Sequence, residues 1–214
     1  MEKVNVNKTV FWNVDTQVDF MNENGKLYVP NAENIKVTLS NITNFANVNN
    51  IRVVNTMDWH YEDSEEISDE PNYSETFPPH CIIGTEGCEF IGETKPHDPY
   101  IYDWSVNLEI TNLPSNRNLI IRKDKFDVFQ GNLNTKKIVK CLKNGGIERI
   151  YVYGVAGDVC VAYAVENLIE LGFEVVLISN AISALNDVSM ENSIKAWSKS
   201  DNFRIIKFTE DFSI

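Results

Sequence analysis

The stretch RIYVYGVAGDVCVAYAVENLIELG, residues 149–172, contains the pattern that decides the fold. Residues 149–153 form a short run of β-branched and aromatic side chains, as expected of a strand that is covered on both faces. A turn containing Gly157 follows, and residues 159–171 place apolar side chains at helical spacing until Gly172, a residue type that commonly ends helices. A buried strand that passes through a tight turn into a helix indicates one half of a βαβ unit.

The same alternation extends through most of the chain. The predicted strands are residues 10–14, 52–56, 118–121, 149–153, 173–179 and 203–208, and the predicted helices are residues 31–48, 135–142, 159–171 and 189–197. This order predicts an α/β fold in which a parallel sheet has helices on both faces. With 214 residues, 43% of them hydrophobic, the chain suits a single domain, 1–214, with one core.

Residues 61–104 interrupt the alternation with a long segment rich in Asp, Glu, Pro and Gly. We expect an insertion loop here, inside the domain. Loops of this length in compact domains usually serve a function or are disordered. The acidic part, EDSEEISDEPNYSE (62–75), also has a simpler interpretation as solvated surface charge.

The composition excludes several classes of partner. Acidic residues number 31 against 19 basic ones, and the net charge of -12 repels nucleic acid and anionic membranes. The polar start MEKVNVNKTVFWNVD and the lack of a long apolar window predict neither a signal peptide nor a membrane span. The four cysteines contain no CxxC pair and do not indicate a disulfide scaffold, so we expect a cytoplasmic protein.

Four of the six predicted strands end in polar residues. The first runs into Asp15, the second into Asp58 and His60, the third into Lys123 and the fourth into the turn before Cys160. Ligands of open parallel sheets bind beyond the carboxyl ends of the strands. An acid, a metal-type pair, a lysine and a cysteine at this edge therefore indicate a catalytic constellation.

Cys160 lies where the glycine-containing turn enters a helix. The helix dipole and the first-turn amides are expected to lower its pKa and favour the thiolate. The backbone amides of Ala156 and Cys160 could also hold the oxyanion of a tetrahedral intermediate. The alternative is a small buried thiol that packs the helix against the sheet, which is the role we expect for Cys81, Cys88 and Cys141.

Asp15 and Lys123 each have two interpretations. Asp15 follows a buried strand directly, so desolvation would raise its pKa and suit it to accept a thiol proton; the alternative is an acid that caps the next segment. Lys123 could hold a carboxylate and a thiolate in place, or it could be an exposed member of the charge run RKDK at 122–125.

A metal site is predicted from three residues. Asp58 and His60 form an Asp-x-His pair at one strand end, and His80 in the run FPPHC (77–81) could add a second imidazole. Aspartate and histidine suit Zn²⁺ and neighbouring divalent ions, and three protein ligands leave positions open. Only the fold can bring these residues together. The third histidine, His97, is expected to be a loop residue.

These motifs, in this order, resemble those of the isochorismatase-like cysteine hydrolases and, among them, the nicotinamidases. The matching segments are DTQVDF (15–20), TMDWH (56–60), FPPHCIIGTEG (77–87), Lys123 with Phe126 and Phe129, and GVAGDVCV (154–161). The resemblance implies a three-layer α/β/α sandwich with a six-stranded, mainly parallel sheet. It also implies the catalytic set Asp15, Lys123 and Cys160, with a non-proline cis peptide at Val155–Ala156.

The resemblance further implies the metal ligands Asp58, His60 and His80, which relatives acting on isochorismate or carbamoyl substrates generally lack. Zn²⁺ is the expected ion, with Mn²⁺ and Fe²⁺ as alternatives. Gln17, Phe20 and Phe77 match substrate-binding positions, although many relatives have tryptophan in place of Phe77. Some relatives have a further His or Glu ligand, for which the candidates here are Glu62, Asp63, Glu65, Glu66 and Asp69.

The expected activity is hydrolysis of nicotinamide to nicotinic acid and ammonia through a thioester on Cys160, with Asp15 carrying the proton. One alternative is a related cysteine hydrolase acting on another small amide, a carbamoyl compound or isochorismate. Another is a binding member of the fold without catalysis. Dimers and larger assemblies are common in the family, so a homo-oligomer is one expectation.

Overall fold

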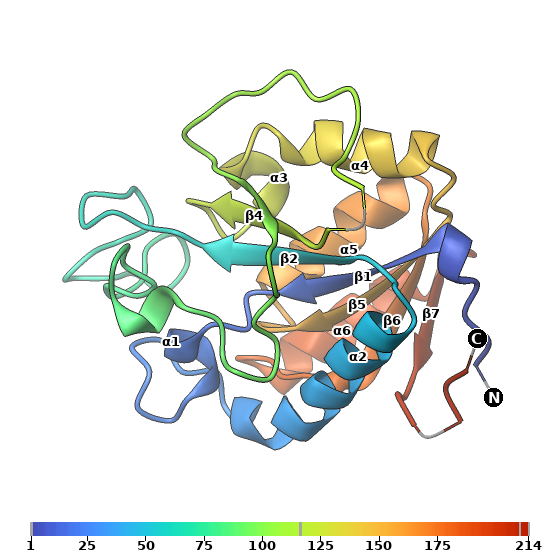
Figure 1. The fold of residues 1–214 in the computed structure, drawn as a ribbon. Helices are drawn as coiled ribbons and strands as arrows, with labels where there is room; N and C mark the ends of the chain where they lie inside the picture. Colours follow the sequence, from blue (N-terminus) through green and yellow to red (C-terminus); the bar gives the residue numbers. More distant parts are fainter. Residues whose placement is uncertain (1, 116, 210, 214) are drawn as a thin grey trace.

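One parallel sheet organises the computed structural model, which describes residues 2–115, 117–209 and 211–213 (Figure 1). Every strand pair along it is parallel, and the order is β3-β4-β2-β1-β5-β6-β7. The strands are β1 (Thr9–Val14), β2 (Val53–Asp58), β3 (Tyr100–Tyr102), β4 (Leu119–Lys123), β5 (Arg149–Gly154), β6 (Glu174–Ile182) and β7 (Phe203–Ile206).

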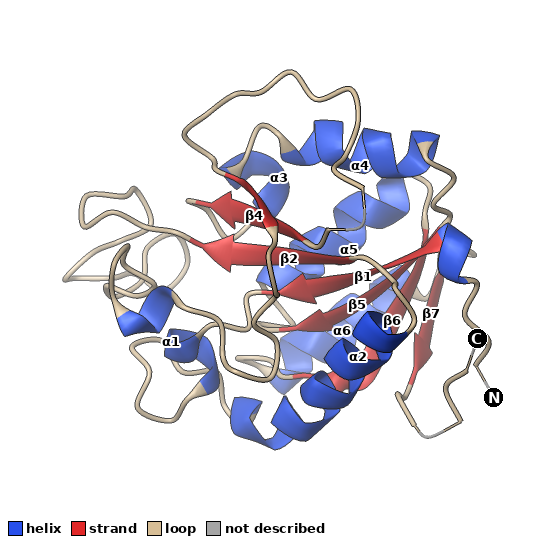
Figure 2. Ribbon diagram, in the orientation of Figure 1, coloured by secondary structure: helices blue, strands red, loops and turns tan. Residues whose placement is uncertain are grey.

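Helices cover both faces of the sheet (Figure 2). The helices are α1 (Val18–Met21), α2 (Lys36–Val48), α3 (Val128–Gly131), α4 (Thr135–Asn144), α5 (Cys160–Glu170) and α6 (Asp187–Trp197), with 3-10 turns η1 (Val6–Lys8), η2 (Ala32–Ile35) and η3 (Glu86–Cys88). The apolar side of α2 packs on one face, whereas α4, α5 and α6 pack on the other. No helix of the described chain is long and apolar enough to cross a membrane.

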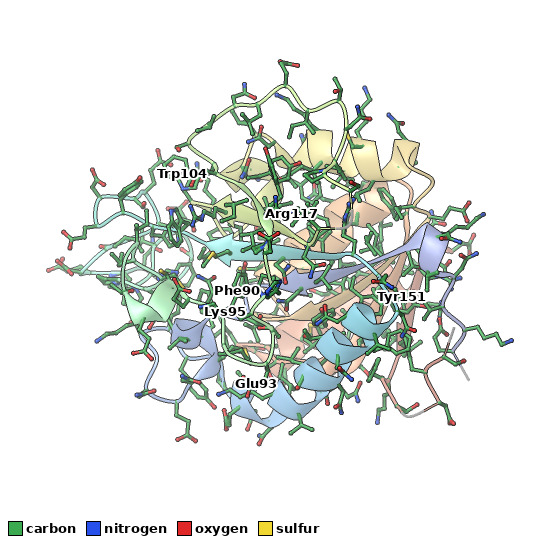
Figure 3. All side chains as sticks on the ribbon, viewed as in Figure 1. Phe90, Glu93, Lys95, Trp104, Arg117 and Tyr151 are labelled. Carbon is green, nitrogen blue, oxygen red and sulfur yellow. The ribbon has the colours of Figure 1, made fainter. Side chains whose placement is uncertain are left out.

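Alternation along the central strands produces two cores. In β1, Phe11 joins Tyr151 of β5 and α2 on one face, and Trp12 joins α4 and α5 on the other. Side chains fill the space between the layers (Figure 3). Both cores are needed because successive residues of a strand point to opposite faces. The central strands therefore have little freedom to move, and their carboxyl ends are fixed points for functional groups.

The predicted α/β class and parallel sheet are confirmed, but the count of six strands is wrong by one. The additional strand, β3, lies inside the segment expected to be an insertion loop and pairs with β4 at the sheet edge. Two of its three residues, Tyr100 and Ile101, are exposed, so it lacks the apolar run of a central strand. Its pairing with β4, rather than its own pattern, makes it a strand.

Strand order creates a crevice between β1 and β5. From β1, the chain adds β2 on one side and β5 on the other, which is the switch point where such sheets bind ligands. Gly154 ends β5 there with φ 121°, and a Cβ atom at this position would lie 2.1 Å from the carbonyl oxygen of Val14. Glycine thus lets the turn toward Cys160 approach β1 closely.

Candidate active site

The structure brings Asp15, Lys123 and Cys160 together at the carboxyl edge of the sheet. Asp15 follows β1, Lys123 ends β4 and Cys160 is the first residue of α5. The Lys123 Nζ atom lies 2.9 Å from Asp15 Oδ2 and 3.7 Å from Cys160 Sγ. All three side chains are buried. Lys123 is therefore not the exposed lysine that its charge run also suggested.

Asp15 is held in a fixed orientation. Its backbone has a left-handed φ of 47°, and its Oδ1 atom accepts a 2.6 Å hydrogen bond from the Thr56 hydroxyl. Burial raises the pKa of Asp15. The positive charge of Lys123 opposes this shift, and the nearby negative charge of Asp58 adds to it. Burial alone would lower the pKa of Lys123, but the carboxylates of Asp15 and Asp58 raise it well above its usual range. Lys123 is a permanent cation between two acids.

The expectation of a low thiol pKa at Cys160 is wrong. Burial raises the pKa of Cys160 well above its ordinary value; Lys123 opposes this effect, and the charges of Asp15 and Asp58 add to it. The helix N-terminus favours the thiolate, but the depth of the site outweighs it. Cys160 therefore rests as a neutral thiol, and the raised pKa of Asp15 makes that carboxylate a suitable proton acceptor.

Asp58, His60 and His80 form a buried cluster whose ligand atoms all lie within 4.8 Å of one another. Asp58 Oδ2 is 3.7 Å from His60 Nε2 and 3.6 Å from His80 Nε2. Neither ring nitrogen of His60 has a hydrogen-bond partner among the described residues. A buried imidazole without partners is costly, and a divalent cation would complete it.

The rest of the cluster also suits a metal ion. His80 Nδ1 lies 2.8 Å from the Pro78 carbonyl oxygen, to which it donates, so Nε2 keeps its lone pair for an ion. Burial would raise the pKa of Asp58, but Lys123 and the two histidines hold it well below its usual range. An ionised carboxylate and two neutral imidazoles are a common ligand set for Zn²⁺.

Asp58 connects this cluster to the group formed by Asp15, Lys123 and Cys160. Its Oδ1 atom accepts a hydrogen bond from the Lys123 ammonium, and its Oδ2 atom faces the histidines. Gln17, expected at the substrate, lies instead against the backbone: its amide donates to the carbonyls of Asp58 and Cys88 at 2.8 Å and accepts from Asp58 N at 2.7 Å. The structure thus places Gln17 where it positions Asp58.

A small pocket lies at this site, and the turn before α5 contributes to its lining. The Val155–Ala156 peptide is cis. The Gly157 amide donates to the Ser183 carbonyl at 2.8 Å, and the amides of Val159 and Val161 donate to the Ala156 carbonyl at 3.1 and 3.0 Å. Ala156 and Cys160 both line the pocket. Their amides are the ones we expected at an oxyanion.

Aromatic side chains form the wall of the pocket. Phe20 and Phe77 both lie against His80, with ring centroids 5.4 and 6.3 Å away, and Phe77 also contacts Phe126. The free volume is only about 30 Å³, far below the roughly 300–1,000 Å³ of typical ligand sites. A ligand of ordinary size would therefore have to displace part of this wall.

Glu66 is the member of the acidic run that faces this pocket. Its side chain is buried, with the residue 7% exposed, and both its carboxylate oxygens accept a hydrogen bond from the Phe126 amide. The other four candidate ligands in the acidic run are exposed. Burial, together with the charge of Asp58, raises the pKa of Glu66 to about 8. In the sequence, the burial of Glu66 is indicated only by the adjacent Ile67, an apolar residue within the acidic run. In the structure, Ile67 forms a β-bridge with Phe77.

Known proteins resemble the chain over most of its length. The isochorismatase domain family matches residues 9–204. The nicotinamidase/pyrazinamidase of Mycobacterium tuberculosis is 26% identical over 74% of this chain and 77% of its own. The nicotinamidase of Saccharomyces cerevisiae is 24% identical over 90% of this chain and 96% of its own.

A solved structure supports the fold independently. The zinc complex of the Pyrococcus horikoshii pyrazinamidase has a TM-score of 0.71 and 24% identity, covering 94% of this chain and 99% of that one. A family match from β1 to β7, together with this parallel sheet and its cysteine-containing switch point, settles the assignment. The chain belongs to the isochorismatase family.

Proposed function

We propose that this protein is a metal-dependent nicotinamidase that hydrolyses nicotinamide to nicotinic acid and ammonia through a thioester on Cys160. Its family and its relatives indicate an amidohydrolase. One observation carries the narrower proposal: Asp58 contacts Lys123 with one carboxylate oxygen and faces two histidines with the other. An acyl-transfer set and a metal-type cluster thus share one side chain.

In this proposal the protein's own residues move the protons. Asp15 accepts the proton of the Cys160 thiol, and the thiolate attacks the carboxamide carbon to form a C–S bond. The amides of Ala156 and Cys160 stabilise the oxyanion. The C–N bond then breaks, and Asp15 returns the proton to the leaving nitrogen, which departs as ammonia.

Hydrolysis of the thioester uses the same groups in reverse. Asp15 takes a proton from water as the water oxygen attacks the thioester carbon. The C–S bond then breaks, the acid is released, and Asp15 returns the proton to the Cys160 sulfur. Lys123 stays charged throughout. Its contacts with Asp15 and Cys160 keep both groups in place and stabilise negative charge as it moves between them.

Asp58, His60 and His80 would hold the metal, for which Zn²⁺ fits best and Mn²⁺ or Fe²⁺ are alternatives. When bound, such an ion supplies a Lewis-acid site that can coordinate a pyridine nitrogen. Phe20 and Phe77, which lie against His80, would pack on the ring of the substrate. This division leaves the carboxamide to Cys160.

We also place the reaction in pyridine nucleotide salvage in the cytoplasm. The four cysteines are free thiols, as a reducing compartment requires. The proposed substrate is a small amide, and the proposed assembly is a homo-oligomer.

Ammonia release by the metal-loaded protein tests the proposal. Nicotinamide should release ammonia, Cys160→Ala should abolish the release, and Cys141→Ala should retain it because Cys141 lies outside the site. Pyrazinamide should also react, since its ring nitrogen can bind the metal. Hydrolysis of maleamate or isochorismate without any activity on nicotinamide would overturn the assignment.

A further inference from the structure

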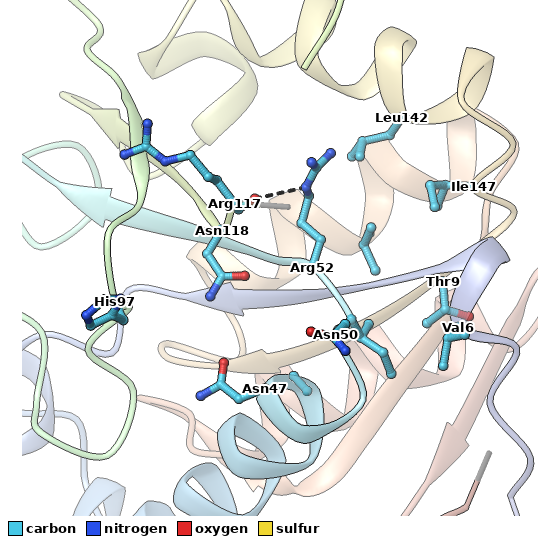
Figure 4. A pocket seen from close by; sticks show the side chains of 13 residues that line it. Val6, Thr9, Asn47, Asn50, Arg52, His97, Arg117, Asn118, Leu142 and Ile147 are labelled. Atoms are coloured by element: carbon cyan, nitrogen blue, oxygen red, sulfur yellow. Dashed lines mark hydrogen bonds between the residues drawn. The ribbon is translucent and has the colours of Figure 1, made fainter. Parts of the chain in front are cut away.

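A second cavity lies at the amino edge of the sheet, opposite Cys160. Its volume is about 650 Å³, within the roughly 300–1,000 Å³ range of small-molecule sites. Figure 4 shows its wall at the starts of three strands: Thr9 begins β1, Arg52 precedes β2 and Asn118 precedes β4. Asn47 and Asn50, from the end of α2, and His97 add further polar side chains to the wall.

This cavity is cationic in a chain with a net charge of -12. Arg52 and Arg117 line it, and no acidic residue is among the described residues of its lining. The Arg117 guanidinium is paired with Asp98 at 2.9 Å. Arg52 has no carboxylate partner in the described part of the chain; its Nε donates to the Arg117 carbonyl at 3.0 Å and its Nη2 to the Pro114 carbonyl.

The surroundings of Arg52 indicate a missing anion. Its two hydrogen bonds go to backbone carbonyls, which bring no negative charge. Partial burial lowers the pKa of Arg52, which is the direction expected for a desolvated cation without a counter-ion.

The neutral part of the wall suits the body of an organic ligand. Asn118 Oδ1 accepts from the Val53 amide at 2.9 Å, which leaves its NH₂ group to donate. Ile51, Leu142 and Ile147 offer apolar contact beside the asparagines. An inorganic anion would neutralise Arg52 but leave most of the volume empty.

We propose that this cavity binds a phosphorylated small molecule of mononucleotide size. The phosphate lies at the Nη1 end of the Arg52 guanidinium, which still has N–H donors that the two carbonyls do not use. The sugar and the ring lie against the asparagine amides and the apolar wall. This site is separate from the active site and does not depend on the proposed activity.

The strands connect the two sites physically. Three strands run from the cavity to the active site. β1 leads directly into Asp15, β2 ends at Asp58 and β4 ends at Lys123, and each strand has five or six residues. At about 3.3 Å per residue, the cavity lies roughly 17–20 Å from the catalytic edge. A ligand in the cavity therefore cannot touch the reacting groups, and its binding can be measured apart from catalysis.

Isothermal titration of the full chain with AMP, adenosine, inorganic phosphate and citrate tests the proposal. AMP should bind at least about 10-fold more tightly than phosphate because it also contacts the neutral wall, and adenosine should bind about 10- to 100-fold more weakly than AMP because it lacks the charged contact. Arg52→Gln should weaken AMP binding by about 10- to 100-fold. Asn47→Ala should weaken it by about 2- to 10-fold.

Two controls locate the binding. Lys195→Gln removes a distant exposed cation and should leave AMP affinity unchanged, and so should His80→Ala, which alters the metal cluster. The proposal is overturned if AMP does not bind at millimolar concentration, if citrate binds and AMP does not, or if His80→Ala abolishes binding. If Arg52→Gln fails to fold, Asn47→Ala decides: unchanged AMP affinity in that variant overturns the assignment.

Discussion

Burial keeps Cys160 protonated, and Asp15 is the group placed to take its proton. Burial, with the charges of Asp15 and Asp58, raises the pKa of the thiol, and burial also raises the pKa of Asp15. The raised pKa of Asp15 makes it a better proton acceptor than an ordinary carboxylate, while Lys123 remains charged beside both groups. In the proposed mechanism, catalysis therefore depends on proton transfer within the site rather than on a standing thiolate.

Asp15→Asn should separate reactivity toward alkylating agents from catalysis. Removing the Asp15 charge lowers the pKa of Cys160, so iodoacetamide should modify Cys160 faster than in the wild type at pH 8. Hydrolysis should fall by about 10²- to 10⁴-fold because the proton acceptor is lost. Peptide mass spectrometry gives the alkylation rate, with Cys141 as internal reference; slower alkylation together with the loss of activity would contradict this pairing.

Glu66 should make the stability of the metal-free protein depend on pH. Its folded pKa of about 8 exceeds its ordinary 4.5, so the folded state keeps a proton that the unfolded chain releases. The free energy of unfolding should therefore fall as the pH rises from about 4.5 to 8, and Glu66→Gln should flatten this fall. Urea unfolding across that range measures it. The matched control is Glu65→Gln, at an exposed side chain, and an equal effect of both variants would refute the assignment.

The position of a site residue in the fold decides whether the sequence can predict it. Asp15, Asp58, His60 and Lys123 stand at strand ends, where parallel strands gather side chains from distant segments. Gln17 and Glu66 bind backbone groups of other segments, and those contacts exist only after folding. The thiol pKa was mispredicted for a similar reason, because burial depth is a property of the folded molecule.

Among the elements, the central strands and long helices were predictable because their apolar periodicity records which faces are covered. β5 and α5 show this, with a buried strand and an apolar helix face in continuous sequence. β3 was not predictable, since Tyr100 and Ile101 are exposed and only its pairing with β4 defines it. Short edge strands depend on their neighbours.

The turn between β5 and α5 should tolerate no side chain at its start. In Gly154→Ala the Cβ atom would meet the Val14 carbonyl at 2.1 Å, at φ 121°. We expect a loss of more than about 3 kcal/mol in the free energy of unfolding. Gly92→Ala is the matched control, because its Cβ meets nothing within 4 Å. Chemical denaturation of both variants measures the difference, and a loss below 1 kcal/mol at Gly154 would show that the turn can relax.

For the whole molecule, the Asp58–His60–His80 cluster connects β2 to the inserted segment that carries His80. A bridge between His60 and Ile82 brings the two segments together, and a bound ion would tie them further. Ligands that bind only the folded state raise its stability by mass action. The insertion should therefore be the part of the fold that responds most to metal.

Chelation should lower the thermal midpoint of the metal-loaded protein by several degrees, since about 1 kcal/mol shifts it by roughly 2–4 °C at this size. His80→Ala should start from the lower midpoint and should not respond to chelator. His97→Ala, outside the cluster, should respond as the wild type does. Scanning calorimetry with metal analysis measures both, and an equal response of His80→Ala and the wild type would exclude the cluster as the site.

Partition of the reaction with hydroxylamine tests the thioester on Cys160 most directly. If nicotinamide and a nicotinate ester pass through one acyl-enzyme, hydroxylamine captures the same intermediate from both. The account predicts nicotinohydroxamate and nicotinic acid in the same ratio from the two substrates, with no product of either kind in Cys160→Ala. Ammonia release without any hydroxamate at high hydroxylamine, or different ratios from the two substrates, would contradict it.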